Sequence, residues 1–327
     1  MKRSLSSIPL FVALLSGCGA PHDLSEKYYL VVGNTKSPYW EEAAAGLRRA
    51  ASELRVTASV AGPETFAPDR QAAEFRRIAA MKPAGILVSA SDPKLLGPEI
   101  DAAVAAGIPV IAIDADAPGS KRLTFVGTNN YEAGLMAGRD LVRRLKGKGQ
   151  VMVFTTAGQT NLEERLTGYR AALESAPGVA IAEVVDIRGN PSKAFDRVTE
   201  VLESGKPVVD AFVSLEGQSP GDVAEVLKRK GGGKVVMAMD TVEATLNAID
   251  NGQISATVAQ KPFTMAYVGL RLLADLRLYK MARLDANFSE DPHSSMPRFI
   301  DTGATLIDKT HLSGYRENLR RTKAEAK

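Results

Sequence analysis

Two aspartates follow directly on apolar segments, and they are the residues best placed to do chemistry. Asp114 comes after Pro109–Ile113, and Asp240 comes after Val235–Met239. An ionised carboxylate accepts hydrogen bonds from two neighbouring hydroxyl groups and is costly to bury without such donors. Both residues therefore indicate a ligand rich in hydroxyl groups. Each also has a structural interpretation: loop amides could satisfy Asp114, and Asp240 could be the N-cap of a helix that begins near Thr241.

Further candidates open predicted helices. Tyr39 and Trp40 begin the first helix; their flat rings could cover the C–H face of a sugar ring or pack on their own sheet. Arg165 lies one turn after Asn161, so both side chains share a helix face. The planar guanidinium of an arginine can hold two acceptor oxygens at once. The alternative for this arginine is a surface pair with an aspartate or a glutamate.

A regular alternation of strand and helix would position these candidates. Runs rich in Val and Ile suit a sheet that is buried on both faces, and strict alternation with amphipathic segments implies parallel crossovers. The predicted strands are 28–32, 56–60, 85–88, 109–113, 151–154, 181–185, 211–213, 235–239 and 255–259. The predicted helices are 39–54, 70–81, 95–106, 131–145, 162–175, 193–202, 221–230 and 242–250. The fold class is α/β and doubly wound.

The number of strands predicts two lobes, because one such sheet needs about 150 residues. The alternation breaks near 125–130, 259–262 and 291–297, which predicts a three-crossing hinge between two Rossmann-like lobes. We expect lobe 1 to contain 28–127 and 261–296, and lobe 2 to contain 128–260 and 297–327. Asn129 and Gln260 lie at two crossings, where a side chain can reach both the hinge and an interlobe cleft.

Other polar residues that follow predicted strands give weaker indications of a binding site. Ser89 comes after the third strand and is a weaker candidate for the cleft, whereas Asp92 precedes Pro93 and is better explained as a helix cap. Asp186 and Arg188 follow a strand of lobe 2 and are equally well explained as a solvated loop.

The N-terminal segment indicates export. Lys2 and Arg3 precede a short apolar stretch that ends in Leu15-Ser16-Gly17-Cys18. This is the architecture of a secretory signal, and it is too short to span a bilayer as a helix. The run before the cysteine resembles the lipobox of bacterial lipoproteins, which implies cleavage before Cys18 and acylation of its sulfur. The alternative is an ordinary signal with an incidental cysteine. We expect a signal peptide over 1–17 and a polar tether over 18–27.

Composition disfavours several classes of function. Loss of Lys2 and Arg3 lowers the formal charge from +3 to +1, so no basic excess remains to attract nucleic acid. A single cysteine leaves no disulfide in the chain. No histidine adjoins a nucleophile at a strand end, and no Cys or His cluster has metal-ligand spacing. We therefore expect no metal, no cofactor and no enzyme. The enzymatic alternative is glycoside processing, because Asp114, Glu216 and Asp240 could converge.

Six motifs in order carry a resemblance to a known family. They are Ser37–Trp40, Ile108–Asp114, Val126–Asn129, Asn161–Tyr169, Asp240 and Val258–Gln260. With them the chain resembles the periplasmic sugar-binding proteins of the ribose-binding type, which are solute receptors of ABC importers. The resemblance covers about residues 28–307. The same fold occurs in sugar-responsive repressors, but here a signal takes the place of their helix-turn-helix.

The resemblance implies the type I periplasmic binding protein fold, with a monosaccharide or related polyol bound between the lobes. Glu216 lies where the ribose-type proteins carry an asparagine, and Ala115 follows Asp114 where they carry an arginine. Ribose itself is thus in doubt, although Asp116 could partly compensate. The implied partners are an ABC permease and ATPase or, alternatively, a membrane sensor. We expect a monomer in the periplasm or at the cell surface, held to a membrane only through Cys18.

Overall fold

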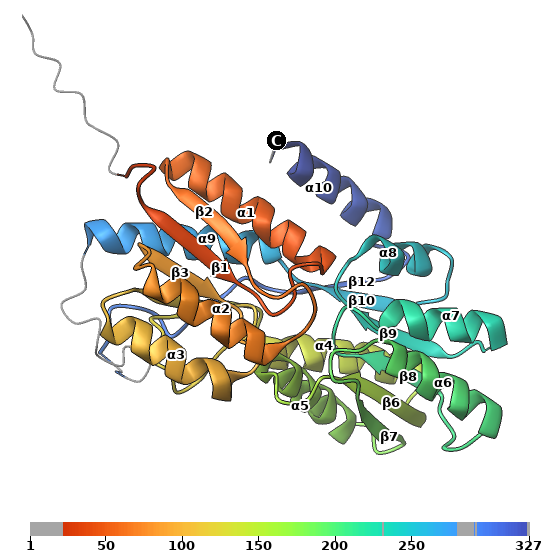
Figure 1. The fold of residues 1–327 in the computed structure, drawn as a ribbon. Coiled ribbons are helices and arrows are strands. Elements are labelled where there is room, and N and C mark those ends of the chain that lie inside the picture. Colours follow the sequence, from red (N-terminus) through yellow and green to blue (C-terminus); the bar gives the residue numbers. More distant parts are fainter. Residues whose placement is uncertain (1–21, 231, 280–290, 292, 326–327) are drawn as a thin grey trace, which may run out of the picture.

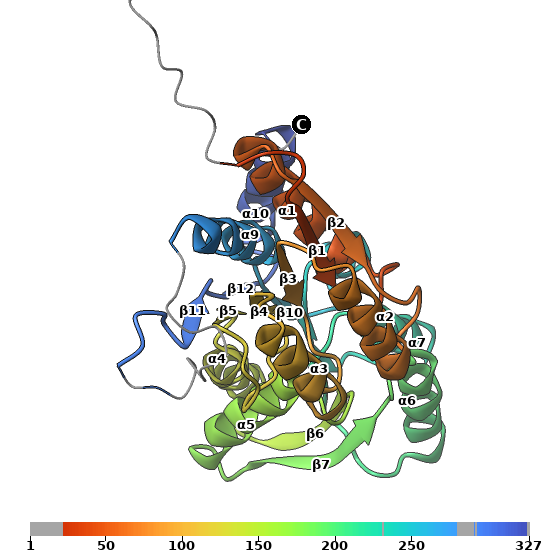
Figure 2. The same cartoon turned by 60° about the vertical axis from the view of Figure 1, so that its left-hand side comes forward.

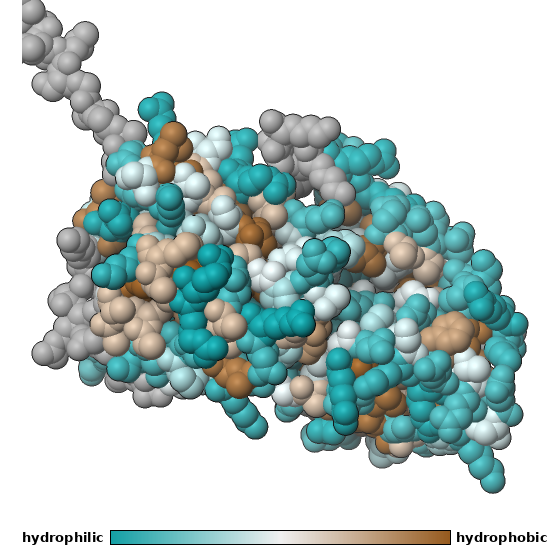
Figure 3. All heavy atoms as spheres, in the orientation of Figure 1, coloured by the Kyte–Doolittle hydropathy of each residue, from teal (hydrophilic) through white to brown (hydrophobic). Residues whose placement is uncertain are grey.

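The computed structural model describes residues 22–230, 232–279, 291 and 293–325 (Figure 1). Each of its two lobes holds a six-stranded sheet with helices on both faces, seen in Figures 1 and 2. The view in Figure 3 shows apolar residues in small groups among hydrophilic ones. Within the described ranges, no helix has the length and apolarity that crossing a bilayer requires. The predicted signal peptide and Cys18 lie outside the described residues.

Lobe 1 is built on the strand order β11-β5-β4-β3-β1-β2, with all neighbours parallel. Helices α1 and α9 cover one face, and α2 and α3 cover the other, each pair enclosing its own apolar cluster. The strands are β1 (Lys27–Val31), β2 (Thr57–Ala61), β3 (Gly85–Val88), β4 (Val110–Ile113), β5 (Phe125–Gly127) and β11 (Phe299–Asp301). The helices are α1 (Pro38–Leu54), α2 (Pro68–Ala80), α3 (Pro93–Ala105) and α9 (Pro262–Leu278).

Lobe 2 repeats this plan with the order β12-β10-β9-β8-β6-β7, in which only the β10–β12 pair is antiparallel among the described strands. Helices α4 and α5 pack on one face, and α6, α7, α8 and α10 on the other. The strands are β6 (Gly149–Thr155), β7 (Val179–Asp186), β8 (Ala211–Ser214), β9 (Val235–Met239), β10 (Ala256–Ala259) and β12 (Thr305–Ile307). The helices are α4 (Asn130–Arg144), α5 (Thr160–Glu174), α6 (Ser192–Ser204), α7 (Pro220–Lys230), α8 (Glu243–Asp250) and α10 (Leu312–Glu325).

The shared strand order makes β4 and β9 equivalent strands of the two lobes. In each sheet the order reverses next to the first strand of the lobe, between β1 and β3 and between β6 and β8. Ligands of open α/β sheets bind outside the carboxyl ends of the strands at such a reversal. The prediction of two doubly wound lobes is confirmed. Asp114 and Asp240 follow β4 and β9, which lie one strand beyond the reversal in each sheet and end at the same carboxyl edge.

The chain passes between the lobes three times, but the third passage differs from the prediction. The first two lie between β5 and α4 and between β10 and α9, as expected. The predicted boundary at 296/297 is wrong, because β11 pairs with β5 and therefore belongs to lobe 1. The third crossing connects Asp301 to Thr305. Strand β11 is three residues long and holds only two apolar residues, Phe299 and Ile300, so the sequence carries only a weak strand signal there.

The predicted tether also ends earlier than expected. His22 and Glu26 are buried against lobe 1, where the His22 Nδ1 and Glu26 Oε2 atoms lie 3.1 Å apart. Tyr28 donates a hydrogen bond to the same carboxylate at 2.9 Å, and Arg277 of α9 lies 3.4 Å from it. These contacts fix residues 22–26 on the lobe, so the described part of the tether is packed.

Two glycines allow α4 and α5 to touch backbone to backbone. A Cβ atom at Gly134 would lie 2.1 Å from the carbonyl oxygen of Arg165, and one at Gly168 would lie 2.1 Å from that of Tyr131. Such distances are too short for real atoms, so any side chain at either position must push the helices apart. Because α5 carries Asn161 and Arg165, the glycines set the depth of both side chains.

We predict that Gly134→Val lowers the melting temperature and weakens ligand binding together. Overpacking of this kind costs about 1–3 kcal/mol, and it displaces the helix that bears Arg165. The control is Gly97→Ala on α3, where nothing lies within 4 Å of the added atom. That variant should gain up to about 1 kcal/mol from helix propensity. Thermal denaturation of both variants is the measurement. A native melting temperature for Gly134→Val would contradict the prediction.

Candidate functional site

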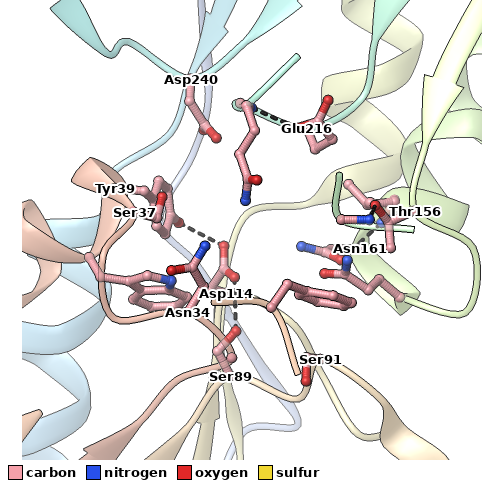
Figure 4. A pocket seen from close by; sticks show the side chains of 18 of the residues that line it. Asn34, Ser37, Tyr39, Ser89, Ser91, Asp114, Thr156, Asn161, Glu216 and Asp240 are labelled. Atoms are coloured by element: carbon pink, nitrogen blue, oxygen red, sulfur yellow. Dashed lines mark hydrogen bonds between the residues drawn. The ribbon is translucent and has the colours of Figure 1, made fainter. Parts of the chain in front are cut away.

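A cavity of about 810 Å³, including its open mouth, lies between the lobes at the carboxyl ends of both sheets (Figure 4). Lobe 1 and lobe 2 both contribute side chains to it. All nine residues predicted to bind the ligand line this cavity: Tyr39, Trp40, Ser89, Asp114, Asn161, Arg165, Glu216, Asp240 and Gln260. The structure thus brings the predicted set together.

Asp114 is held at the end of β4 in a left-handed backbone conformation, with φ of 63°. Its two carboxylate oxygens accept hydrogen bonds from the Tyr39 hydroxyl at 2.7 Å and from Ser89 Oγ at 2.9 Å. Burial raises the pKa of this carboxyl, while the two hydroxyls and the charge of Arg165 oppose that rise. A carboxylate has about four acceptor positions, so Asp114 keeps capacity for hydroxyl groups of a ligand.

The aromatic pair beside Asp114 packs against lobe 1 and also lines the cavity. The rings of Tyr39 and Trp40 meet edge to face, with centroids 5.0 Å apart and planes at 88°. Trp40 is buried within the apolar cluster under α1, and both rings also line the cavity. Tyr39 directs its hydroxyl to Asp114, so the pair forms an ordered aromatic wall.

Asp240 occupies the equivalent position in lobe 2, after β9, and it too is left-handed with φ of 65°. Its Oδ1 atom accepts a hydrogen bond from Gln260 Nε2 at 2.8 Å. Burial raises its pKa to about 6; the charges of Asp114 and Glu216 add to the rise, and Arg165 opposes it. The N-cap of α8 is Val242, so the capping interpretation of Asp240 is wrong.

Arg165 is buried, with 3% of its surface exposed, and it is not a surface ion pair. Its guanidinium donates to Asn130 Oδ1 at 2.9 Å, to the Leu215 carbonyl at 2.8 Å and to Gln260 Oε1 at 3.0 Å. A guanidinium has five N–H groups, so two remain after these three bonds. The protein therefore fixes the plane of Arg165 before any ligand arrives.

Gln260 connects the crossings to the cavity floor. Its oxygen accepts from Thr128 Oγ1 at 2.9 Å as well as from Arg165. Asn129 does not line the cavity: its side chain caps α4 by accepting from Glu132 N at 3.1 Å, and its own N–H donates to Asp301 Oδ1 at 3.1 Å. Asn129 thus joins the first crossing to the third, which suits the predicted hinge position.

Glu216 and Asn161 each accept hydrogen bonds from backbone N–H groups close to them in sequence. The Glu216 carboxylate accepts from Gln218 N at 2.6 Å and from Ser219 N at 3.2 Å, just before α7 begins. Burial raises its pKa and these bonds oppose the rise. Asn161 accepts from Leu162 N at 3.0 Å, which leaves its amide nitrogen to face the cavity.

Several loop residues that line the cavity were not predicted from the sequence. They are Asn34, Ser37, Phe66, Ser91, Thr156, Gln159 and Gln218. Polar loop residues of these types are common everywhere, so no sequence signal distinguishes them. Asp92 caps α3, as expected, with Lys94 N donating at 2.8 Å. The side chains of Asp186 and Arg188 lie outside the cavity lining.

The two lobes already touch across the cavity mouth. Thr160 Oγ1 of lobe 2 donates to the Asp116 carbonyl of lobe 1 at 2.9 Å. A Cβ atom at Gly189 would lie 2.6 Å from the Phe66 ring, so this aromatic side chain packs directly on the lobe 2 backbone. The Asp116 carboxylate pairs with the buried Arg122 and does not line the cavity, so it does not take the compensating role considered for it.

The described residues contain no group of three or more His, Cys, Asp or Glu side chains able to hold a metal ion. His22 contacts Glu26, and His311 contacts Asp308 at 2.8 Å. Neither of these histidines belongs to the cavity lining. What the cavity offers instead is a set of hydrogen-bonding groups beside an aromatic wall.

A family model described as "Periplasmic binding protein domain" matches residues 28–280. The ribose import binding protein RbsB of Bacillus subtilis is 23% identical over 280 residues, covering 80% of this chain and 89% of that protein. The structure of AraP, an arabinose-binding protein from Geobacillus stearothermophilus, is 30% identical with a TM-score of 0.73, covering 88% and 98% of the chains. A structure of a XylFII–LytSN complex is 24% identical, covers 87% and 98%, and has a TM-score of 0.77. RbsB and AraP are both named as binding proteins.

Proposed function

Since this chain belongs to the periplasmic binding protein family, we propose that it is an extracytoplasmic solute receptor for a monosaccharide or related polyol. The nine residues predicted to bind the ligand are the proposed contacts. The observation that carries the proposal is the equivalent placement of Asp114 and Asp240 in the two lobes. Each is an acceptor-rich carboxylate at the end of an equivalent strand, and each faces the same cavity from its own lobe (Figure 4).

The cavity chemistry supports a polyol in particular. Carboxylate and amide groups can accept from vicinal hydroxyls, and the face of Tyr39 or Trp40 can cover an apolar C–H face of the ring. The names of the relatives agree with this ligand class, since they refer to ribose and arabinose. Ala115 and Glu216, which depart from the ribose-type pattern, argue against ribose itself.

A thermal-shift screen over pentoses, hexoses and polyols tests the proposal. A ligand that binds only the native state raises the melting temperature; at a hundredfold excess over Kd it adds about 2.7 kcal/mol of stability. We expect at least one monosaccharide to give a clear shift. Titration calorimetry then gives its affinity. If no carbohydrate shifts the transition at millimolar concentration, the proposal is wrong.

We propose delivery of the ligand to an ABC permease and ATPase, by analogy with the import protein of Bacillus subtilis. The alternative is presentation of the ligand to a membrane sensor; the XylFII–LytSN complex shows only that a protein of this fold can assemble with a second protein. Neighbouring genes discriminate between the two: permease and ATPase genes indicate import, whereas a kinase or chemoreceptor gene indicates sensing. Pull-down from detergent-solubilised membranes with the ligand-bound receptor would identify the partner.

Anchoring through Cys18 is a separate part of the proposal, based on the Leu15-Ser16-Gly17-Cys18 run. We predict that Cys18→Ser moves the protein from the membrane fraction to the soluble periplasmic fraction. Ligand affinity should stay the same, because the cavity is built from residues 33–260. Fractionation and mass spectrometry of the mature N-terminus provide the check. An unacylated mature protein that begins elsewhere than at Cys18 would refute the anchor.

Closure of the lobes on the ligand is predicted from the three crossings. The contacts Thr160–Asp116 and Phe66–Gly189 hold the lobes together at the mouth, so a ligand must enter while both are broken. We expect small-angle scattering to show a larger radius of gyration without ligand than with it. Phe66→Ala should reduce that difference by weakening the closed state. An identical radius in both conditions would indicate a rigid site.

A further inference from the structure

The interlobe cavity carries more carboxylates than cations. Asp114, Glu216 and Asp240 line it, and Arg165 is the one cationic side chain among the described residues that do so. Three carboxylates and one guanidinium give a formal charge of −2 when all are ionised. The whole chain carries +3 at pH 7, so the negative charge is a local property of this cavity.

The single guanidinium does not neutralise the two strand-end aspartates by direct pairing. The three hydrogen bonds of Arg165 within the described residues all go to uncharged acceptors: Asn130, the Leu215 carbonyl and Gln260. Asp114 accepts only from the hydroxyls of Tyr39 and Ser89, and Asp240 only from the Gln260 amide among the described side chains. Both carboxylates therefore keep unused acceptor positions and lack a cationic partner in contact.

A neighbouring groove extends the acidic surface. It shares Tyr39, Asp240, Val242 and Gln260 with the cavity, and it is also lined by Glu41, Glu42 and Glu243 against Arg48. This groove lies between the start of α1, the loop before α8 and α10. Carboxylates outnumber cationic side chains in this groove, although Glu243 also lies 3.6 Å from Arg316. Such an excess raises the local concentration of cationic solutes. A cation would thus be attracted both to the approach and to the site.

We propose that the ligand is a polyol that carries a primary ammonium group, namely an unacylated amino sugar. The ammonium lies near Asp114 and Asp240, and the ring lies against Tyr39 and Trp40. The proposal rests on the proposed function and specifies its ligand class. A neutral sugar replaces the displaced water with hydroxyl donors but leaves the formal charge of −2 in the cavity uncompensated. An ammonium replaces it with charge-assisted hydrogen bonds and is also attracted by aromatic faces.

The titration of the cavity agrees with this charge argument. Burial raises the pKa of Asp114, of Glu216 and of Asp240, the last to about 6. The groups that face Asp240 are Arg165 and Gln260, which lower its pKa, and Asp114 and Glu216, which raise it. A bound ammonium favours the ionised carboxylate, so binding should release protons at pH 5.5, where the ligand amine is already protonated, and the affinity should increase from pH 5.5 to 7. A neutral ligand buries the carboxylate further while its hydroxyls donate to it, and these two effects oppose each other, so its binding should release fewer protons.

Matched pairs of sugars test the proposal. Glucose, galactose and mannose are compared with derivatives in which an amine replaces the hydroxyl at carbon 2, 3 or 6, and with their N-acetyl forms. Titration calorimetry is run at pH 5.5 and 7 in two buffers of different ionisation enthalpy. We expect at least one amine to bind 10-fold more tightly than its parent, with proton release. Asp240→Asn and Asp114→Asn should each reduce that preference at least 10-fold, whereas Asp196→Asn, exposed on α6, should not change it.

Different results would refute the amino-sugar proposal and the receptor function. If a parent sugar or an N-acetyl form binds as tightly as every amine derivative, the ammonium proposal is overturned and the receptor function stands. Proton uptake at pH 5.5 on binding of the tightest ligand would overturn it as well. If neither neutral nor amine-bearing sugars bind, the proposed function fails together with the inference.

Discussion

Replacing Arg165 by alanine is expected to lower both ligand affinity and stability, and it should be the most damaging single change in the cavity. The guanidinium donates to three buried acceptors on α4, after β8 and after β10. Leaving buried acceptors unpaired costs about 1–3 kcal/mol each. We expect a loss of about 3 kcal/mol or more in the free energy of unfolding and a decrease in affinity of about 100-fold or more.

Loss of the guanidinium charge also changes the titration of the cavity. Because Arg165 holds the pKa of Asp240 down, its removal should raise that pKa further. Arg165→Lys should recover part of the charge effect but not the three-way bonding, since an ammonium lacks the planar fork. Arg170→Ala, exposed on the same helix, is the control. Circular dichroism melts and calorimetry decide: near-native melting with lost affinity would assign Arg165 to the ligand alone.

Replacing Asp114 is expected to weaken binding while leaving the fold nearly intact. Asp114→Ala removes the acceptor for at least two ligand hydrogen bonds. At about 1–3 kcal/mol each, and with about 1.4 kcal/mol per decade, the affinity should fall about 100-fold. The left-handed backbone at this position costs a residue such as alanine about 1–2 kcal/mol, so a modest decrease in melting temperature accompanies it.

Asp114→Asn removes the carboxylate charge while keeping a side chain of nearly the same shape. Asparagine tolerates the left-handed region, and its side-chain oxygen can still accept from the Tyr39 hydroxyl. We therefore expect a native melting temperature and an intermediate loss of affinity, measured by titration calorimetry. If Asp114→Asn binds as tightly as the native chain and Asp114→Ala loses only stability, the aspartate is a structural residue of the β4 end.

Much of the fold could be predicted because apolar runs and helix periodicity mark it directly. The strands β3 and β9 begin and end where the sequence predicts. By contrast, β11 and β12 are three residues long and contain exposed positions. Only their pairing with β5 and β10 makes them strands, and such partners are more than 45 residues away in sequence. The third crossing was therefore misplaced.

The residues of the site, likewise, could be predicted only where the local sequence carried a signal. Asp114 and Asp240 could be identified because a charged residue directly after an apolar strand must be satisfied by something. Phe66 could not, because its approach to the cavity depends on how the lobes close. The partners of Arg165 were equally hidden, since Leu215 and Gln260 lie 50 and 95 residues along the chain. These three bonds give Arg165 a structural role beside the ligand contact that we propose for it.

The left-handed conformation shared by Asp114 and Asp240 has a consequence for how this receptor can evolve. Codons for aspartate become codons for asparagine or glycine by a single transition. Those are the two other residues that accept such a backbone readily. The most frequent point mutations at these positions therefore remove a carboxylate without straining the strand ends. Ligand charge is thus the trait that natural variation can alter first, while the architecture that presents the ligand is retained.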